Sequence, residues 1–91
     1  MATTITIFYP NNQQVLPSFA AYGTTDDNAI VNVIVSQNGV PVGAPFVVLR
    51  QPPPGGGTWI ISVDMPSGLK GNFALTVVTA SGLADSKPFW I

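Results

Sequence analysis

Few side chains of this 91-residue chain could carry out chemistry, because it contains no histidine, no cysteine and no glutamate. General acid or base catalysis would fall to Asp26, Asp27, Asp64 or Asp85, or to a lysine. Asp26 and Asp27 are adjacent, and adjacent side chains of an extended backbone point to opposite sides, so they cannot pair as a catalytic dyad. The composition excludes thiol chemistry and Cys/His zinc sites. We therefore expect a protein that is not an enzyme and that has no cofactor.

One formal catalytic motif occurs, because Ser67-Gly-Leu-Lys70 matches the S-x-x-K pattern of serine acylases. That chemistry needs the serine at the start of a helix, together with Ser-Asp-Asn and Lys-Thr-Gly elements that this chain lacks. Pro66, Gly68 and Gly71 instead favour a turn here. We interpret the segment as a connection between strands.

The segment Asp26-Asp27-Asn28 is a candidate calcium site, because carboxylate and amide oxygens are the ligands that Ca²⁺ prefers. Hard cations take six or more oxygens, and these three side chains supply few of them. Asp and Asn in loops also cap backbone N–H groups. We expect the capping role, with a metal site at Asp26, Asp27 and Asn28 as the alternative.

Aromatic residues provide the other candidate binding site, since Tyr9, Tyr22, Phe89 and Trp90 are not all explained by the core pattern. Phe89 and Trp90 should alternate, with one ring buried and the other half-buried against a neighbouring loop. Trp90 with Tyr9 or Tyr22 could instead contact a sugar or a protein, as aromatic rings on a flat sheet do in many carbohydrate-binding modules. Both interpretations remain open from the sequence.

Charge and hydropathy exclude several classes of partner. The formal net charge is −1, and Arg50, Lys70 and Lys87 are the only cationic side chains, so a nucleic-acid partner is excluded. No apolar stretch approaches the roughly 18 residues needed to span a bilayer. The opening segment has neither the cationic nor the apolar region of a secretory signal.

Strand signals dominate the chain, and helical periodicity is absent. Short runs rich in Val, Ile, Thr and aromatic residues are separated by Gly, Pro, Asn and Asp at a spacing of roughly 10 to 12 residues. This pattern predicts an antiparallel β-sandwich of about seven strands that forms a single domain over residues 1–91, with a closed barrel as the main alternative. The expected strands cover residues 3–9, 15–23, 29–37, 40–49, 58–64, 72–80 and 83–91.

Alternation within three of these runs predicts the core, because side chains two residues apart share a face. Asn38-Gly39 favours a two-residue hairpin turn, so residues 40–49 should return beside residues 29–37. Pro41 and Pro45 place that returning strand at a sheet edge, with a break near Gly43. The predicted core residues are Trp59, Ile61 and Val63, then Phe73, Leu75 and Val77, and Val31, Val33 and Val35.

Several segments resemble the bacterial immunoglobulin-like domains of surface and exported multidomain proteins. Residues 7–15 and 19–24 are similar to the opening of that family, in which a strand, a proline and a polar turn precede a strand closing on Gly-Thr. Residues 57–63 resemble its G-T-W strand, and residues 71–82 its G-x-F-x-L-T-V strand and turn. The resemblance implies a non-catalytic spacer, adhesive or accessory module. Thr79-Ala80-Ser81-Gly82 lacks the acidic residue with which many relatives bind calcium between modules.

Low charge also bears on association, since only 8% of the residues are charged and edge strands are usually guarded by charges. Homo-oligomerisation, or packing against a neighbouring module, is therefore an expectation. A protein or a glycan is the expected partner, with a carbohydrate-binding module as the alternative function. The compartment would be extracellular or the cell surface for a piece of an exported bacterial chain, and otherwise the cytoplasm or a virion.

Overall fold

Runs rich in β-branched and aromatic residues form strands along the whole chain, because such side chains favour extended backbone. The computed structural model describes residues 3–42 and 46–91, and within them every regular element is a strand. The strands are β1 (Ile5–Tyr9), β2 (Gln13–Gln14), β3 (Ser18–Thr25), β4 (Ile30–Gln37), β5 (Val40–Pro41), β6 (Phe46–Arg50), β7 (Gly57–Asp64), β8 (Asn72–Thr79) and β9 (Ala84–Trp90).

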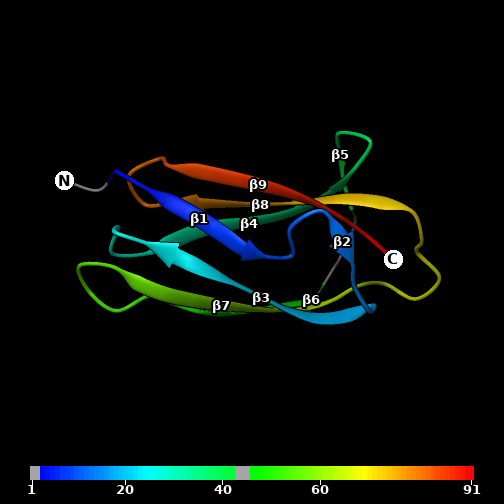
Figure 1. Ribbon diagram of the computed structural model, residues 1–91, viewed down its shortest axis with the longest axis horizontal. Coiled ribbons are helices and arrows are strands. Elements are labelled where there is room, and N and C mark those ends of the chain that lie inside the picture. Colours follow the sequence, from blue (N-terminus) through cyan, green and yellow to red (C-terminus); the bar gives the residue numbers. More distant parts are fainter. Residues whose placement is uncertain (1–2, 43–45) are drawn as a thin grey trace.

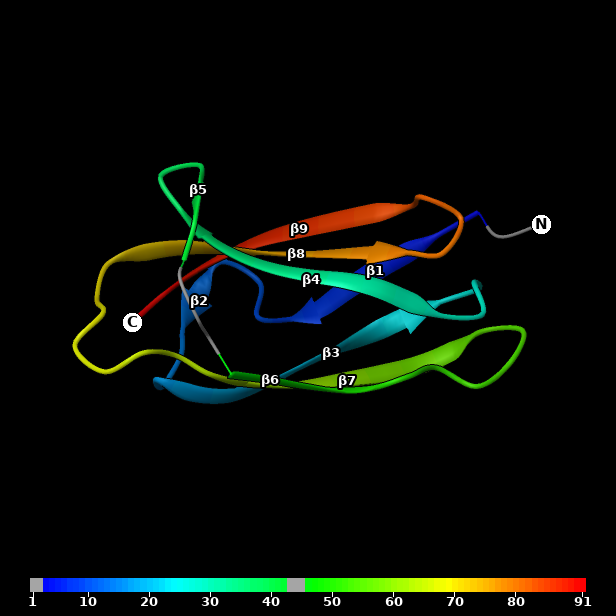
Figure 2. The ribbon, with the colours of Figure 1, turned by 180° about the vertical axis from the view of Figure 1, so that it is seen from behind.

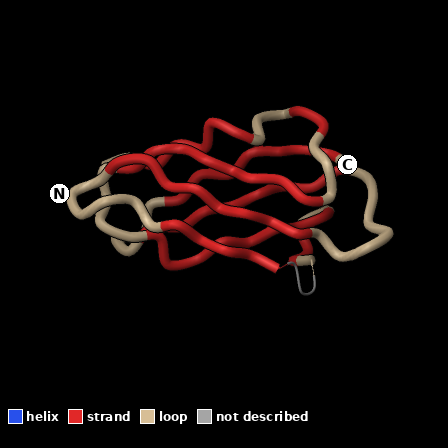
Figure 3. Tube along the Cα trace, turned by 90° about the horizontal axis from the view of Figure 1, so that it is seen from below, coloured by secondary structure: helices blue, strands red, loops and turns tan. Residues whose placement is uncertain are grey.

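Two sheets pack face to face, so the predicted all-β sandwich is confirmed (Figure 1). A four-stranded sheet has the order β1-β3-β7-β6, and a five-stranded sheet has the order β2-β9-β8-β4-β5. Neighbouring strands are antiparallel except β2 and β9, which are parallel. Among the described residues no ladder joins the two sheets, so the structure is not a closed barrel. Strands and loops make up all of the described chain (Figure 3).

The predicted strand over residues 40–49 is two strands that belong to different sheets. The hairpin turn at Asn38 and Gly39 is present, with φ values of 54° and 78°, and β5 returns beside β4 as expected. β5 ends at Pro41, and β6 begins at Phe46 in the other sheet, where it pairs with β7. The break was expected near Gly43, which lies with Pro45 outside the described residues.

Trp59 lies fully buried between the sheets. Its cross-strand partner on β3 is Gly23, and a Cβ on Gly23 would lie 2.6 Å from Cζ2 of Trp59 and 1.9 Å from the carbonyl oxygen of Thr6. The absence of a side chain on Gly23 therefore makes room for the indole ring. The core around Trp59 includes the predicted residues Ile61, Val63, Phe73, Leu75, Val77 and Val35.

The core prediction is wrong for Val31, which is 63% exposed. The pairing of β4 with β8 shifts between Ile30 and Asn32, where the ladder contains a β-bulge. A bulge adds one residue to a strand and so reverses the alternation on one side of it. Ile30 consequently fills the core position expected for Val31, while Val33 is partly buried against the core.

Candidate functional site

Asp26, the first of the candidate metal ligands, fastens the N-terminal strand to the end of β3. Its Oδ1 accepts hydrogen bonds from the backbone N–H groups of Thr3 and Thr4, both at 2.9 Å. Its Oδ2 accepts a hydrogen bond of 2.7 Å from the hydroxyl of Thr3. These bonds, with the backbone of Thr4 contributing most, lower the pKa of Asp26 to about 2.

Asp27 is buried and binds a different part of the chain. Its Oδ2 accepts a hydrogen bond from the N–H of Ser81 at 2.9 Å, and its Oδ1 accepts one from the N–H of Asn28 at 2.7 Å. A hydrogen bond from the side chain of Thr79 is the largest of the effects that lower the pKa of Asp27 to about 2. Asp27 therefore joins the loop after β3 to the turn between β8 and β9.

Asn28 contacts a third segment, because its Oδ1 accepts a hydrogen bond of 2.8 Å from the N–H of Gly55. Asp26, Asp27 and Asn28 thus bind three separate segments at one end of the sandwich. Within the part of the chain that the structure describes, no group of three or more His, Cys, Asp or Glu side chains could hold a metal ion. The geometry is that of a capping loop.

The candidate aromatic residues are divided between the two sheets. Trp90 lies on β9 in the five-stranded sheet, with its ring 37% exposed on the outer face, since the preceding Phe89 is buried. Tyr9 and Tyr22 lie on β1 and β3 in the four-stranded sheet. Trp90 and the two tyrosines thus lie on different sheets, and a site that combines them stays a prediction.

Tyr9 and Tyr22 do come together. They are cross-strand partners, and their rings stack with centroids 5.9 Å apart and planes 10° apart. Phe8 points outward because the preceding Ile7 is buried, and its ring meets Tyr22 edge-on with centroids 6.5 Å apart. The irregular pairing after Ile7 places Tyr9 opposite Tyr22 on the same face. Phe8 and Tyr22 remain 52% and 45% exposed. Three aromatic rings therefore gather on the outer face of the four-stranded sheet.

This cluster continues across the sheet as one cross-strand row. Tyr9 is opposite Tyr22, Tyr22 is opposite Ile60 on β7, and Ile60 is opposite Arg50 on β6. We call these four residues the exposed row. A groove of about 520 Å³ lies at its β6 end, lined by Val48, Leu49, Arg50, Ile60 and Ser62.

Tyr9 and Tyr22 were predicted from the sequence as surface residues, whereas Phe8, Val48, Arg50 and Ile60 were not. The alternation of side chains along residues 57–64 does predict an outward position for Ile60. Ile60 lies between the inward residues Trp59 and Ile61, so it must point outward, and a large apolar residue at an outward position is informative. The row itself could not be found, because it depends on the order of strands in the sheet.

The exposed row has the composition of a protein contact surface. Tyrosine and arginine are enriched in protein interfaces, whereas Lys, Glu and Asp are depleted there. The row contains two tyrosines, one isoleucine and one arginine, with Phe8 beside it. It therefore offers an apolar contact surface with one cation at its end.

The described part of the chain has no helix that could span a membrane. No protein-family model matches the sequence, and no curated protein or solved structure matches the chain at a significant level.

Proposed function

We propose that this chain is a non-catalytic interaction or spacer module with an immunoglobulin-like sandwich, of the kind that serves in bacterial cell-surface proteins or virion assemblies. Strand order supports the immunoglobulin-like assignment. In such domains one sheet has the order A-B-E-D and the other contains C, F and G. With β1, β3, β4, β6, β7, β8 and β9 taken as A to G, the orders β1-β3-β7-β6 and β9-β8-β4 agree with that arrangement.

The exposed row is the observation that carries the interaction role. Tyr22 leaves nearly half of its surface in contact with water on a face that also exposes Phe8 and Ile60. Burying such apolar area is favourable by about 25 cal/mol per Å², so a partner that covers these rings gains affinity. Arg50 at the end of the row adds a directional hydrogen-bond donor.

Molecular shape supports a role as a spacer. The molecule is elongated, with principal extents of 40 × 22 × 21 Å. Strand β1 begins near one end of the long axis, and β9 leads to the opposite end (Figure 1). A module of this shape would hold neighbouring modules at opposite ends of its long axis.

The aspartates support the absence of catalysis, because all four make hydrogen bonds within the fold. Asp26 and Asp27 bind loop segments, as described above. Asp64 accepts a hydrogen bond from the hydroxyl of Ser18, and Asp85 accepts one from the N–H of Ile7. Carboxylates occupied in this way are structural, and they are poorly placed to exchange protons with a substrate.

Site-specific crosslinking tests the interaction role. A photo-crosslinking amino acid is placed at position 22 or, as the control, at position 31, whose valine is more exposed (63% against 45% for Tyr22) but lies on the other sheet. We expect a protein adduct in source cells or virions from position 22 only. Tyr22→Ala should then weaken binding of the identified partner by about tenfold or more, while Val31→Ala leaves it unchanged. Equal adducts from both positions would contradict the proposal.

A carbohydrate-binding module is the second candidate function, favoured by the exposed Tyr22 ring. The stacking of Tyr22 on Tyr9 occupies one face of each ring, which leaves less aromatic surface for a sugar. A glycan array separates the two functions. Retention of a glycan that is lost in Tyr22→Ala and kept in Trp90→Ala would establish sugar binding at the exposed row and replace the protein-contact proposal.

A further inference from the structure

Sheet edges are the part of this molecule that the proposed function leaves unused. An edge strand presents unpaired N–H and C=O groups that can pair with another chain, and proteins usually block them. Among the described residues, β1 and β6 are the edges of the four-stranded sheet, and β2 and β5 are those of the five-stranded sheet. These edges differ in how they are covered.

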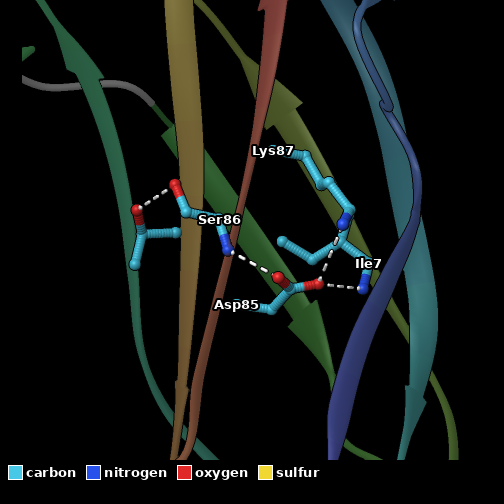
Figure 4. A network of polar contacts seen from close by, with 5 residues as sticks. Ile7, Asp85, Ser86 and Lys87 are labelled. Atoms are coloured by element: carbon cyan, nitrogen blue, oxygen red, sulfur yellow. Dashed lines mark hydrogen bonds and ion pairs between the residues drawn. The ribbon is translucent and has the colours of Figure 1, made fainter.

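The edge at β1 is covered by a carboxylate from the opposite sheet. The N–H of Ile7 donates a hydrogen bond of 2.8 Å to Oδ2 of Asp85 on β9 (Figure 4). Lys87 lies 3.7 Å from the same oxygen, so a pair of charges faces this edge. Charges that point at an edge are a common protection against pairing with another strand.

The two edge strands of the five-stranded sheet are very short. β2 consists of Gln13 and Gln14 only, and β5 of Val40 and Pro41, which are too short to recruit a strand. At the other end of β4, the side chain of Gln51 covers the backbone of Ile30. Gln51 accepts a hydrogen bond from the N–H of Ile30 at 2.8 Å and donates one to its carbonyl oxygen at 2.9 Å.

The edge at β6 has no such cover among the described residues. Strand β6 pairs with β7 along its whole length and with no other described strand. Figure 2 shows β6 along the side of the molecule that also carries β4 and β5. Its central residue, Val48, is 53% exposed, and Arg50 at its end is its only charged residue. β6 is therefore a five-residue edge of apolar character.

We propose that the outer edge of β6 pairs antiparallel with β6 of a second copy of this chain, which forms a two-fold symmetric dimer. Pairing centred on Val48 uses all five residues of β6. It places Val48 opposite its own counterpart and Val47 opposite Leu49 of the other copy. The two four-stranded sheets then form one continuous sheet, and Tyr9, Tyr22 and Ile60 of the exposed row stay accessible. The inference goes beyond the proposed function, because this dimer needs no other partner.

Charge complementarity favours a second copy as the occupant of this edge. In the register centred on Val48, Arg50 lies opposite position 46 of the other copy, whose neighbour on β7 is Asp64. Arg50 and the other copy's Asp64 thus share one cross-strand row on the same face, about 10 Å apart across two strand spacings. This attraction occurs twice by symmetry, it is weak at this distance in physiological salt, and no like charges meet along the pair. A net charge of −1 per chain opposes the association little.

The dimer is closed, because each molecule has one β6 edge. A two-fold interface uses the same patch on both copies, and so it consumes both free edges at once. The blocked β1 edges end the continuous sheet on either side. We therefore expect a dimer and no larger species.

Sedimentation velocity of the purified chain over a range of concentrations tests this. The wild type should show a monomer–dimer equilibrium. Val48→Lys places two lysines opposite each other and should weaken dimerisation by about tenfold, as should Val48→Glu. Mixing Val48→Lys with Val48→Glu should restore dimers, since unlike charges then meet. The control Val31→Lys, at an exposed valine of the other sheet, should dimerise as the wild type does.

Three results would overturn the inference. They are a wild type that stays monomeric at every concentration, variants of Val48 that dimerise as tightly as the wild type, and a mixture that forms no mixed dimer although each variant is folded by circular dichroism. None of these three results changes the crosslinked adduct expected at position 22. The dimer can therefore be disproved without disproving the proposed interaction role, and the reverse also holds.

Discussion

The N–H of Ile7 on β1 donates a hydrogen bond of 2.8 Å to the carboxylate of Asp85 on β9. The two residues lie 78 positions apart in the sequence and belong to different sheets. β1 is thereby held on one side by β3 and on the other by a side chain of β9 (Figure 4). The same carboxylate accepts a hydrogen bond from the N–H of Ser86 through its other oxygen, at 2.9 Å. This single residue both orders β9 locally and closes the sandwich along one side.

Asp85→Ala should destabilise the protein by about 1–3 kcal/mol, because the part-buried N–H of Ile7 loses its acceptor. Asp85→Asn should recover most of this loss, since an amide oxygen can still accept the bond. Urea unfolding measures both. Lys87→Ala is the control, and loss of its ion pair should cost no more than about 1 kcal/mol. A larger effect of Lys87→Ala than of Asp85→Ala would contradict this view.

Acid should destabilise the fold through Asp26 and Asp27, whose pKa values are each lowered to about 2. A carboxylate with a lowered pKa in the folded state stabilises it above its unfolded pKa of about 3.9, and this contribution is lost as the pH falls toward 2. The thermal midpoint should therefore be flat near neutral pH and fall below about pH 4. Asp27→Asn should lower the midpoint at neutral pH and flatten its decline in acid. An equally steep decline in Asp27→Asn would refute this assignment.

Gly23→Ala should be among the most disruptive single methyl additions, because the new Cβ would lie 1.9 Å from the carbonyl oxygen of Thr6. We expect a loss of at least about 3 kcal/mol by chemical denaturation. Ala20→Val, at an exposed position of the same strand, is the control and should change stability by at most about 0.5 kcal/mol. Removing part of the ring with Trp59→Phe should not rescue Gly23→Ala, since the contact with Thr6 persists.

Gln51 should behave as part of the sheet although it lies outside every strand. Gln51→Ala removes two hydrogen bonds to Ile30 and should cost about 1–3 kcal/mol. Gln51→Glu should be worse at neutral pH, because a carboxylate oxygen would replace the donor that faces the carbonyl of Ile30. The difference in stability between Gln51→Glu and the wild type should shrink as the pH falls to about 4, where the new carboxyl is protonated. Stability of Gln51→Glu that does not depend on pH in this way would contradict the assigned contact.

The sequence by itself determined the strands and most of the inner face of the sandwich. Side chains alternate along a strand with a period of two, so Trp59, Ile61 and Val63 had to share a face, and their size and apolarity directed that face inward. The turn at Asn38 and Gly39 was equally local, because both residues tolerate the positive φ that the hairpin requires. Such features depend only on near neighbours in the chain.

Only the tertiary structure decided which strands are neighbours, and therefore which residues meet. The bulge near Ile30 that exposes Val31 arises from pairing with β8, more than 40 residues downstream. Tyr9 joins Tyr22 while Trp90 lies on the other sheet, and Asp85 and Gln51 protect edges far from them in sequence. Side-chain periodicity specifies the face a residue occupies, but the partner across the ladder is set by long-range packing.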